Sequence, residues 1–279
     1  MLTWKRIHFL QIHIAGWSSP VARQAHNLKV VGSNPTPATH FEAWIFHAVG
    51  HTLTSREESG MKNKLLRRVC QKLNRCANTL SVRRGLGIRD SLADIIYKEN
   101  RSETSYRDLI NIRRALNKTI GLGGDLAELG VYRGGTAKLI ALSCPSVTLH
   151  LFDTFSGFPA KMHKLDTIGI GMYAVGLEAV QEYLSDFSNI VYHKGLFPQT
   201  TKDVAPECQY SFANLDADHY QVTFDALAYF YPRLVSHGMI MLHDYGYVLT
   251  PGVKQAVVDF GGFPLCTELF DHQLLIVKP

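Results

Sequence analysis

The 279-residue chain lacks any long apolar run. A membrane span requires about eighteen consecutive apolar residues, and every apolar stretch of this chain is much shorter. The apolar segment at residues 7–15 is short and is interrupted by His8, Gln11 and His13, which makes it a poor signal peptide. Cysteine is scarce as well: the five residues are odd in number and have no metal-type spacing, which favours reduced thiols in a cytoplasmic protein. With 46% hydrophobic and 19% charged residues, the composition is that of a globular chain.

The formal net charge of +5 is distributed unevenly along the chain. Residues 61–124 contain fifteen Lys and Arg against five Asp and Glu, whereas residues 125–279 contain nine against sixteen. The length accommodates one α/β domain with an appendage, and the asymmetry indicates a basic appendage on an acidic body. The acidic body and the lack of a recognisable binding motif argue against nucleic acid as a partner.

Residues 1–60 show no sustained helical or strand period. Gly32-Ser33-Asn34-Pro35 is what the T-arm of a transfer RNA gene, GGTTCGAATCC, encodes in one reading frame. Glu57-Glu58 can be encoded by a ribosome-binding sequence at a normal spacing before Met61. We therefore expect translation to start at Met61 and residues 1–60 to be a mis-annotated or disordered extension; a genuine flexible extension is the alternative.

Residues 61–120 are expected to form a basic helical lid. Apolar residues follow a helical period over residues 62–80, with Lys and Arg on the opposite face, and a second helix is predicted over residues 106–119. A basic amphipathic helix can bind an anionic membrane surface or an acidic partner. A solvated charged face above a core-facing stripe is the simpler interpretation. The glycine-rich residues 121–124 then end this segment.

From residue 121 onward, short apolar runs alternate with helical stretches, which predicts an α/β domain with a Rossmann-like, doubly wound sheet over residues 121–279. Seven strands are expected, and the last two are too close in sequence for a right-handed crossover. They should therefore form an antiparallel hairpin on a mostly parallel sheet. The expected strands are 125–130, 147–152, 190–194, 209–215, 239–243, 264–269 and 272–277, and the expected helices between them are 135–143, 174–185, 220–231 and 252–260.

The carboxyl ends of the strands are where such open sheets bind ligands. The turn after the first strand contains Glu128, Gly130 and Gly134, but not the Gly-x-Gly-x-x-Gly pattern of dinucleotide-binding folds. Glycine lets the backbone approach a ligand, so this more open turn suits a zwitterionic amino acid; a purely structural turn is an equal alternative. Asp153 ends the second strand, where a carboxylate can accept hydrogen bonds from both hydroxyls of a ribose. A helix cap is its structural alternative.

Acidic residues and a histidine end the fourth and fifth strands. Asp216 follows the fourth strand, and His243 and Asp244 end the fifth. Because these strands should be neighbours in a doubly wound sheet, the three side chains are expected to converge. Two carboxylates and an imidazole suit a divalent cation, without which the acids would repel one another. The alternative is that the acids cap the following helices, for which Asp218 is well placed, and that His243 is a satisfied core residue.

These segments resemble the macrocin O-methyltransferase (TylF-type) family, whose motifs occur in the same order over roughly residues 104–279. The matching segments are 124–135, 153–159, 195–200, 215–220, 231–234, 243–246 and 251–257. The resemblance implies a class I S-adenosylmethionine-dependent fold that methylates a hydroxyl, commonly on a sugar of a natural product, with a magnesium ion. A small hydroxylated acceptor is therefore expected as the partner, and a homo-oligomer is compatible with the sequence.

The resemblance also implies a role for each site residue. Asp216 and Asp244 would ligate the metal, and Asp216 would also be the candidate base. Residues expected to hold S-adenosylmethionine are Glu128, Gly130, Gly134, Asp153, Thr154 and Phe155.

His243 departs from the family's pattern, which has a second Asp at this position. Imidazole is a softer ligand than magnesium prefers and suits manganese, iron or zinc better. Three interpretations stay open: the metal differs, His243 is the general base beside an ion held by two carboxylates, or no metal binds.

Two other functions compete with methyl transfer. A metal-dependent sugar-nucleotide glycosyltransferase could use Asp216-Ala217-Asp218 as an Asp-x-Asp motif, but it leaves the turn at Glu128 and the acid at Asp153 unexplained. A module that binds a membrane surface or an acidic partner through the basic segment would need no catalytic site, and its binding should fall steeply with salt.

Overall fold

Residues 90–269 and 272–279 are described by the computed structural model, and all of them belong to one structural unit. The expected start at Met61, the helix expected over 62–80 and residues 61–89 of the expected lid lie outside the described residues. These expectations therefore stay predictions.

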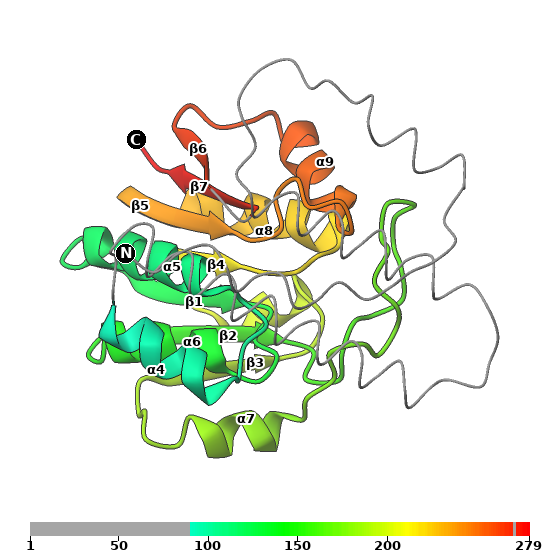
Figure 1. Ribbon diagram of the computed structural model, residues 1–279. Helices are drawn as coiled ribbons and strands as arrows, with labels where there is room; N and C mark the ends of the chain where they lie inside the picture. The colour runs from blue at the N-terminus through cyan, green and yellow to red at the C-terminus, as the bar shows by residue number, and fades with distance from the viewer. Residues whose placement is uncertain (1–89, 270–271) are drawn as a thin grey trace, which may run out of the picture. The chain divides into compact units, whose positions relative to one another are not determined.

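One sheet organises the described residues. Its strands are β1 (Asp125–Leu129), β2 (Leu149–Asp153), β3 (Ile190–Lys194), β4 (Tyr210–Leu215), β5 (Leu234–Leu242), β6 (Cys266–Leu269) and β7 (Gln273–Val277). They lie in the order β3-β2-β1-β4-β5-β7-β6, with β7 antiparallel to both β5 and β6 and the other pairs parallel (Figure 1). The predicted seven-stranded, mostly parallel, doubly wound sheet with an antiparallel C-terminal hairpin is confirmed. Its strand order reverses between β1 and β4, which is where open α/β sheets bind ligands.

Helices cover both faces of this sheet. They are α4 (Ser91–Glu99), α5 (Tyr106–Thr119), α6 (Gly135–Ser143), α7 (Leu177–Tyr183), α8 (Tyr220–Arg233) and α9 (Pro251–Asp259), with a short 3-10 helix, η2 (Gln199–Asp203). In Figure 1, α4, α5 and α6 lie in front of the sheet and α8 lies behind it. Successive strand residues point to opposite faces, so Leu126 and Leu151 join the cluster under α4–α6, whereas Ala127 and Phe152 join the cluster under α8 and α9.

The α5 helix is a layer of the core. Leu109, Ile112 and Leu116 are almost completely buried and belong to the same cluster as β1, β2 and α6. A capping box fixes its start, because the Asp108 N–H donates to Ser105 Oγ at 3.2 Å and the Ser105 N–H donates to Asp108 Oδ2 at 3.3 Å. The described part of the expected lid is thus packed on the sheet, and a lid function for residues 61–120 stays a prediction.

The 3-10 helix η2 was not predicted, α7 and β6 are shorter than expected, and α4 and β5 differ most from the sequence-based expectation. The helix α4 was not predicted; it has nine residues, of which only Ala93 and Ile96 are buried. Its N-terminus is capped by Asp90, which accepts hydrogen bonds from two N–H groups of the first turn. The strand β5 begins five residues earlier than expected, because Leu234 pairs with Tyr210 before a register shift that hydropathy does not reveal.

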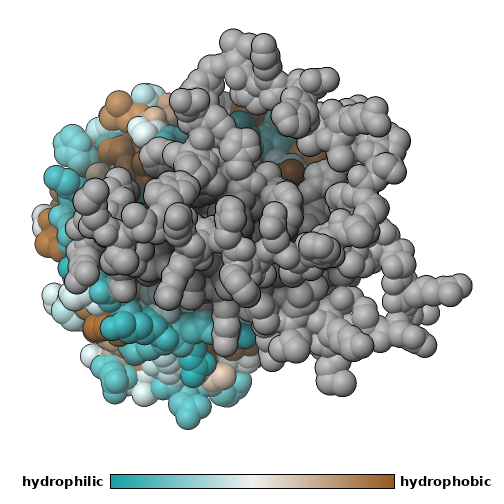
Figure 2. Space-filling model, in the orientation of Figure 1, coloured by the Kyte–Doolittle hydropathy of each residue, from teal (hydrophilic) through white to brown (hydrophobic). Residues whose placement is uncertain are grey.

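The visible surface over α4 and α7 is largely hydrophilic (Figure 2), which agrees with the exposure of Lys98, Glu99, Glu178 and Glu182. Among the described helices, none combines the length and the apolar character needed to cross a bilayer.

Candidate active site

The ends of β1 and β2 are tied together by the Asp153 carboxylate. Its Oδ2 accepts hydrogen bonds from the N–H groups of Val131 at 2.7 Å and Tyr132 at 3.1 Å, and its Oδ1 accepts one from Phe155 at 2.8 Å. An ionised carboxylate has about four acceptor positions, so Asp153 retains capacity for a ligand hydroxyl beside this structural function. The expected alternative, a helix cap, is not what the structure shows.

Close packing explains the two glycines of the first turn. Gly130 has φ +88°, and a Cβ on it would lie 1.9 Å from the backbone oxygen of Asp216, so only glycine allows β1 to end this close to the end of β4. Gly134 is the N-cap of α6 with φ +81°, and a Cβ on it would lie 3.2 Å from Tyr183 of α7. Close packing therefore explains why glycine occupies both positions. Contact of either glycine with a cofactor stays a prediction.

Glu128 lies inside the protein under this turn. Its side chain is completely buried, and Oε1 accepts a hydrogen bond from Asn214 Nδ2 at 3.1 Å, while Oε2 has no hydrogen-bond partner among the described residues. Burial raises the pKa of Glu128 well above its usual range, although the Asn214 bond lowers it. An orphaned buried acceptor at this strand end suits a ligand ammonium group.

The remaining cofactor candidates lie on the turn after β2. The Thr154 hydroxyl donates to the Gly157 carbonyl oxygen at 2.7 Å. Phe155 is buried in the cluster under α4–α6, near Tyr192 of β3. Their contact with S-adenosylmethionine also stays a prediction.

Asp216, His243 and Asp244 converge as expected at the ends of β4 and β5. Each offers one ligand atom, and these atoms all lie within 4.8 Å of one another. His243 Nδ1 lies 3.6 Å from Asp216 Oδ1 and 3.5 Å from Asp244 Oδ1. On its other side, His243 Nε2 lies 3.5 Å from Asp108 Oδ2 of α5. The imidazole therefore sits among three carboxylates that come from three different elements.

Charge coupling inside this cluster is strong. Burial raises the pKa of Asp216 to about 6. Burial lowers the pKa of His243, but Asp216, Asp108 and Asp244 outweigh that effect and raise it well above its usual value. Burial likewise opposes ionisation of Asp244, yet the adjacent His243 imidazole holds the pKa of Asp244 below its usual range. A positive charge, from a proton or a bound cation, therefore stabilises this cluster of carboxylates.

Asp218 belongs to the same cluster and does not behave as a simple exposed helix cap. Burial, together with Asp244 and Asp216, raises the pKa of Asp218 well above its usual range. Its Oδ1 is buried and has no hydrogen-bond partner among the described residues.

Backbone strain marks these strand ends. One non-glycine residue adopts a left-handed conformation after each of β1, β2, β4 and β5, and these are Tyr132, Phe155, Asp218 and Asp244, with φ between 51 and 57°. Such conformations are costly and concentrate at functional sites. Each of the four loops that carry the candidate residues thus contains one such residue, and four more lie elsewhere in the described part of the chain, at Asn100, Tyr173, His237 and His272.

Two residues of the site were not anticipated from the sequence. Asp108 reaches His243 from α5, and Asn214 supports Glu128 from β4. The available signals were an acidic residue, Asp108, in a predicted helix and a polar residue, Asn214, in an apolar strand. Neither signal indicates which residue is the partner.

The donor set at Asp216, His243 and Asp244 fits a divalent cation. His243 Nδ1 is buried and lacks a hydrogen-bond partner among the described residues, and it faces both carboxylates. Asp108 on the opposite ring nitrogen completes a carboxylate–histidine arrangement of the kind that orients metal-binding histidines. Two carboxylates with one imidazole favour Mn²⁺, Fe²⁺ or Zn²⁺ over Mg²⁺.

Known proteins share this sequence pattern. A profile of the macrocin-O-methyltransferase (TylF) family matches residues 99–264. Demethyldecarbamoylnovobiocin O-methyltransferase of Streptomyces niveus is 27% identical over 184 residues, which cover 58% of this chain and 68% of that protein. The 8-demethyl-8-(2,3-dimethoxy-alpha-L-rhamnosyl)-tetracenomycin-C 4'-O-methyltransferase of Streptomyces olivaceus is 31% identical over 158 residues, or 51% of this chain and 59% of that protein. This chain thus spans about 59 to 68% of the length of these two relatives.

Solved structures share the fold. The O-methyltransferase NovP superposes with a TM-score of 0.56 at 22% identity, covering 64% of this chain and 82% of that chain. A calicheamicin methyltransferase superposes with a TM-score of 0.54 at 17% identity, covering 80% of this chain and 94% of that chain. These likenesses establish the class I methyltransferase fold. Because the profile covers more than half of the chain, including the ends of β1, β2, β4 and β5, the chain belongs to the macrocin-O-methyltransferase (TylF) family of S-adenosylmethionine-dependent O-methyltransferases.

Proposed function

We propose that this chain transfers the methyl group of S-adenosylmethionine to a hydroxyl on a sugar or a glycosylated natural product, with the help of a divalent cation. The observation that carries the proposal is the family match over residues 99–264, because the matched segment contains every candidate residue of the site. The names of the relatives support the acceptor class, since both are O-methyltransferases and one is named for a rhamnosyl-tetracenomycin.

S-adenosylmethionine would bind over the ends of β1 and β2. Asp153 retains one acceptor position for a ribose hydroxyl, and the orphaned Oε2 of Glu128 suits the ammonium group. The first turn of α6 after Gly134 has no side-chain cap, so its N–H groups would be available to the methionine carboxylate. A cofactor bound there would lie at the strand-order reversal between β1 and β4, where open α/β sheets bind ligands.

The acceptor hydroxyl would bind beside Asp216, His243 and Asp244. When a cation is bound there, it lowers the pKa of the acceptor hydroxyl and so makes it a better nucleophile. Asp216 accepts the hydroxyl proton, and Asp244 keeps its carboxylate charge next to His243. Asp108 holds the imidazole in one orientation from the α5 side. Positioning of this kind can supply about 7–11 kcal/mol of the barrier reduction.

Calorimetric titration of S-adenosylmethionine into the full chain tests the proposal. We expect one-to-one binding, and we expect Asp153→Ala to raise the dissociation constant at least tenfold, because the variant loses both the ribose acceptor and the ties to Val131 and Tyr132. Asp186→Ala, an exposed acid after α7, is the matched control and should bind as the wild type does. Binding of a nucleotide-sugar in place of S-adenosylmethionine by the folded chain would overturn the proposal in favour of the glycosyltransferase.

A further inference from the structure

A second cluster of metal-binding side chains lies away from the candidate active site. Asp125 is the first residue of β1, His150 lies in β2 and Cys208 precedes β4. At about 3.3 Å per strand residue, Asp125 lies about 13 Å from the end of β1, where the candidate active site begins. The ligand atoms of the three side chains all lie within 4.8 Å of one another.

The spacing of the donors matches a tetrahedral zinc site. His150 Nε2 lies 3.1 Å from Asp125 Oδ2, and Cys208 Sγ lies 3.5 Å from the same oxygen. Zinc bonds of about 2.0–2.2 Å to oxygen, 2.0–2.1 Å to nitrogen and 2.3 Å to sulfur place donors about 3.4–3.6 Å apart at tetrahedral angles. The two separations from Asp125 Oδ2 are therefore within a few tenths of an ångström of those that Zn²⁺ requires, and His150 Nε2 and Cys208 Sγ lie within 4.8 Å of each other.

His193 completes the arrangement from the neighbouring strand β3. Its Nε2 lies 2.8 Å from His150 Nδ1, and its ring stacks on Phe152 with centroids 4.4 Å apart. At this distance the N–H of His150 Nδ1 can donate a hydrogen bond to His193 Nε2. That hydrogen bond fixes the tautomer in which His150 Nε2 is free to bind a metal.

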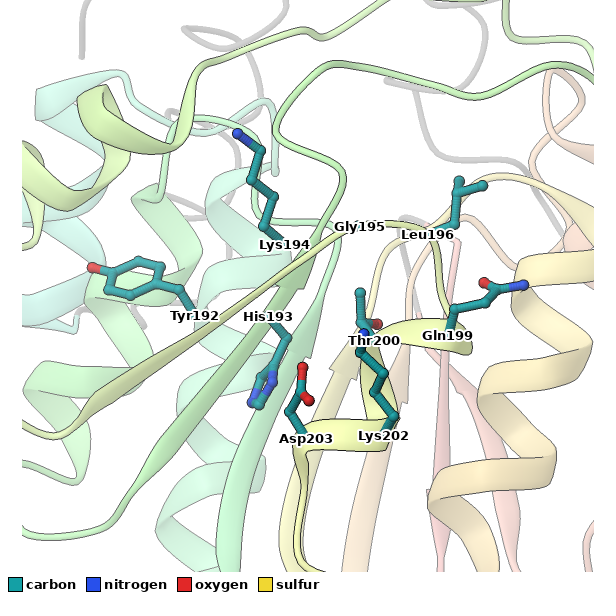
Figure 3. Close-up of a pocket in the computed structure, with 9 residues that line it drawn as sticks. All are labelled: Tyr192, His193, Lys194, Gly195, Leu196, Gln199, Thr200, Lys202 and Asp203. Carbon is teal, nitrogen blue, oxygen red and sulfur yellow. The ribbon is translucent and has the colours of Figure 1, made fainter.

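Solvent reaches the far side of His193. A hollow of about 210 Å³ at the end of β3 and along η2 is lined by His193 and Asp203 and by Lys194 and Lys202 (Figure 3). Asp125 and Cys208 are themselves partly exposed. His150 is thus buried, and the partly exposed Asp125 and Cys208 are the side from which an ion can enter.

We infer that Asp125, His150 and Cys208 bind one Zn²⁺ ion, with His193 as the positioning residue of His150 and one coordination position left to water. A histidine–aspartate ion pair alone would not require a thiol beside it. A sulfur, a nitrogen and an oxygen donor that face one common centre favour Zn²⁺ over Mg²⁺. The ion would bind the amino ends of β1 and β2 to the segment before β4. It would therefore stabilise the sheet without touching the acceptor.

Cobalt substitution tests the site on the full chain after its metal has been removed with a chelator. One equivalent of Co²⁺ should give the visible bands of a tetrahedral ion and a near-ultraviolet charge-transfer band from a thiolate ligand. We expect Cys208→Ser to abolish the thiolate band and to weaken Zn²⁺ binding at least tenfold. Ions at the candidate active site give no such band, because the ligands there are carboxylates and an imidazole.

The controls separate Cys208 from three of the four other thiols, Cys144 being buried in the core. Cys266→Ser, at an exposed position on β6, and the double variant Cys70→Ser with Cys76→Ser should both keep the thiolate band. Should Cys208→Ser fail to fold, Asp125→Asn serves instead and should lower the affinity for Zn²⁺ while methyl transfer continues. A wild-type chain without a thiolate band, or a band that survives Cys208→Ser in folded protein, overturns the inference.

Discussion

Asp108 Oδ2 lies 3.5 Å from His243 Nε2, which joins the first turn of α5 to the end of β5. The same oxygen accepts the N–H of Ser105 in the capping box of α5. One carboxylate thus sets both where the helix starts and how the imidazole is oriented. The position of His243 therefore depends on a helix that the sequence analysis assigned to a lid.

Asp108→Asn should separate these two functions. An amide oxygen can still accept the Ser105 N–H, so the cap is largely kept, but the charge opposite His243 is lost. We expect the affinity for the divalent cation to fall about 10–100-fold. The apparent metal dissociation constant from initial methylation rates is the measurement.

Ser105→Ala is the matched control for Asp108→Asn. It removes the Oγ that accepts the Asp108 N–H and should cost about 1 kcal/mol of stability, while it leaves the carboxylate opposite His243. An equal loss of metal affinity in both variants would mean that Asp108 acts only through the helix start.

Asp216→Asn should remove most of the turnover and leave cofactor binding nearly unchanged. The variant lacks a base and an anionic ligand at the end of β4, and the loss of a positioned base costs about 10²–10⁴-fold in rate. Single-turnover methylation and calorimetry with S-adenosylmethionine separate the two effects. Asp186→Asn, an exposed acid, should leave both unchanged. A wild-type rate in Asp216→Asn would refute the role of this residue.

His243→Asp should change which ion supports the reaction. Wild-type protein, with two carboxylates and an imidazole, is expected to prefer Mn²⁺ to Mg²⁺, and three carboxylates should favour the harder Mg²⁺. The measurement is the ratio of kcat/KM with Mg²⁺ to that with Mn²⁺ in chelator-treated protein. An unchanged ratio would show that His243 does not ligate the ion, and activity in the presence of chelator would show that no ion is needed.

Asp166 should stabilise the protein in a pH-dependent manner. Its buried carboxylate accepts hydrogen bonds from the N–H groups of Met162, His163 and Tyr220, each at 2.9 Å, and thereby caps α8 from a distant loop. Burial alone would raise the pKa of Asp166, but these bonds hold it below the usual value. The stabilisation is therefore complete above about pH 4, the ordinary Asp pKa, and is lost as the pH falls below that.

Asp166→Asn measures this contribution. An amide has one acceptor oxygen, so the variant loses at least one charge-assisted bond, at a cost of about 1.5–3 kcal/mol at pH 7. Urea unfolding at pH 7, 5 and 3.5 should show the wild-type advantage shrinking at the lowest pH. An advantage that is the same at all three values would contradict the prediction.

Gly130→Ala should be far more damaging than its backbone angle alone implies. The added methyl would lie 1.9 Å from the backbone oxygen of Asp216, so the ends of β1 and β4 must move apart. Gly262→Ala is the matched control, because Gly262 has φ +76° and nothing within 4 Å of its Cβ position. The control should cost about 1–2 kcal/mol of unfolding free energy, the ordinary penalty of a left-handed alanine. Equal losses in both variants would mean that the contact with Asp216 relaxes freely.

Local patterns carried much of the prediction. The alternation of strand and helix periods predicted the seven-stranded α/β sheet. This works because the buried face of a helix or strand repeats along the sequence with the period of that element. The chain direction of parallel strands then placed Asp153, Asp216, His243 and Asp244 at one edge. The family resemblance rested on those same strand ends, and the profile match over residues 99–264 agrees with it.

Contacts between distant segments were decided only by the tertiary structure. The period of α5 predicts which face is buried, but not that Asp108 meets His243. Nothing local links Asp125, His150 and Cys208, because their convergence depends on which strands become neighbours and on the register between them. Sequence periodicity reports the environment of each residue, whereas the identity of its neighbours depends on strand order, register and the docking of helices, which no single segment determines.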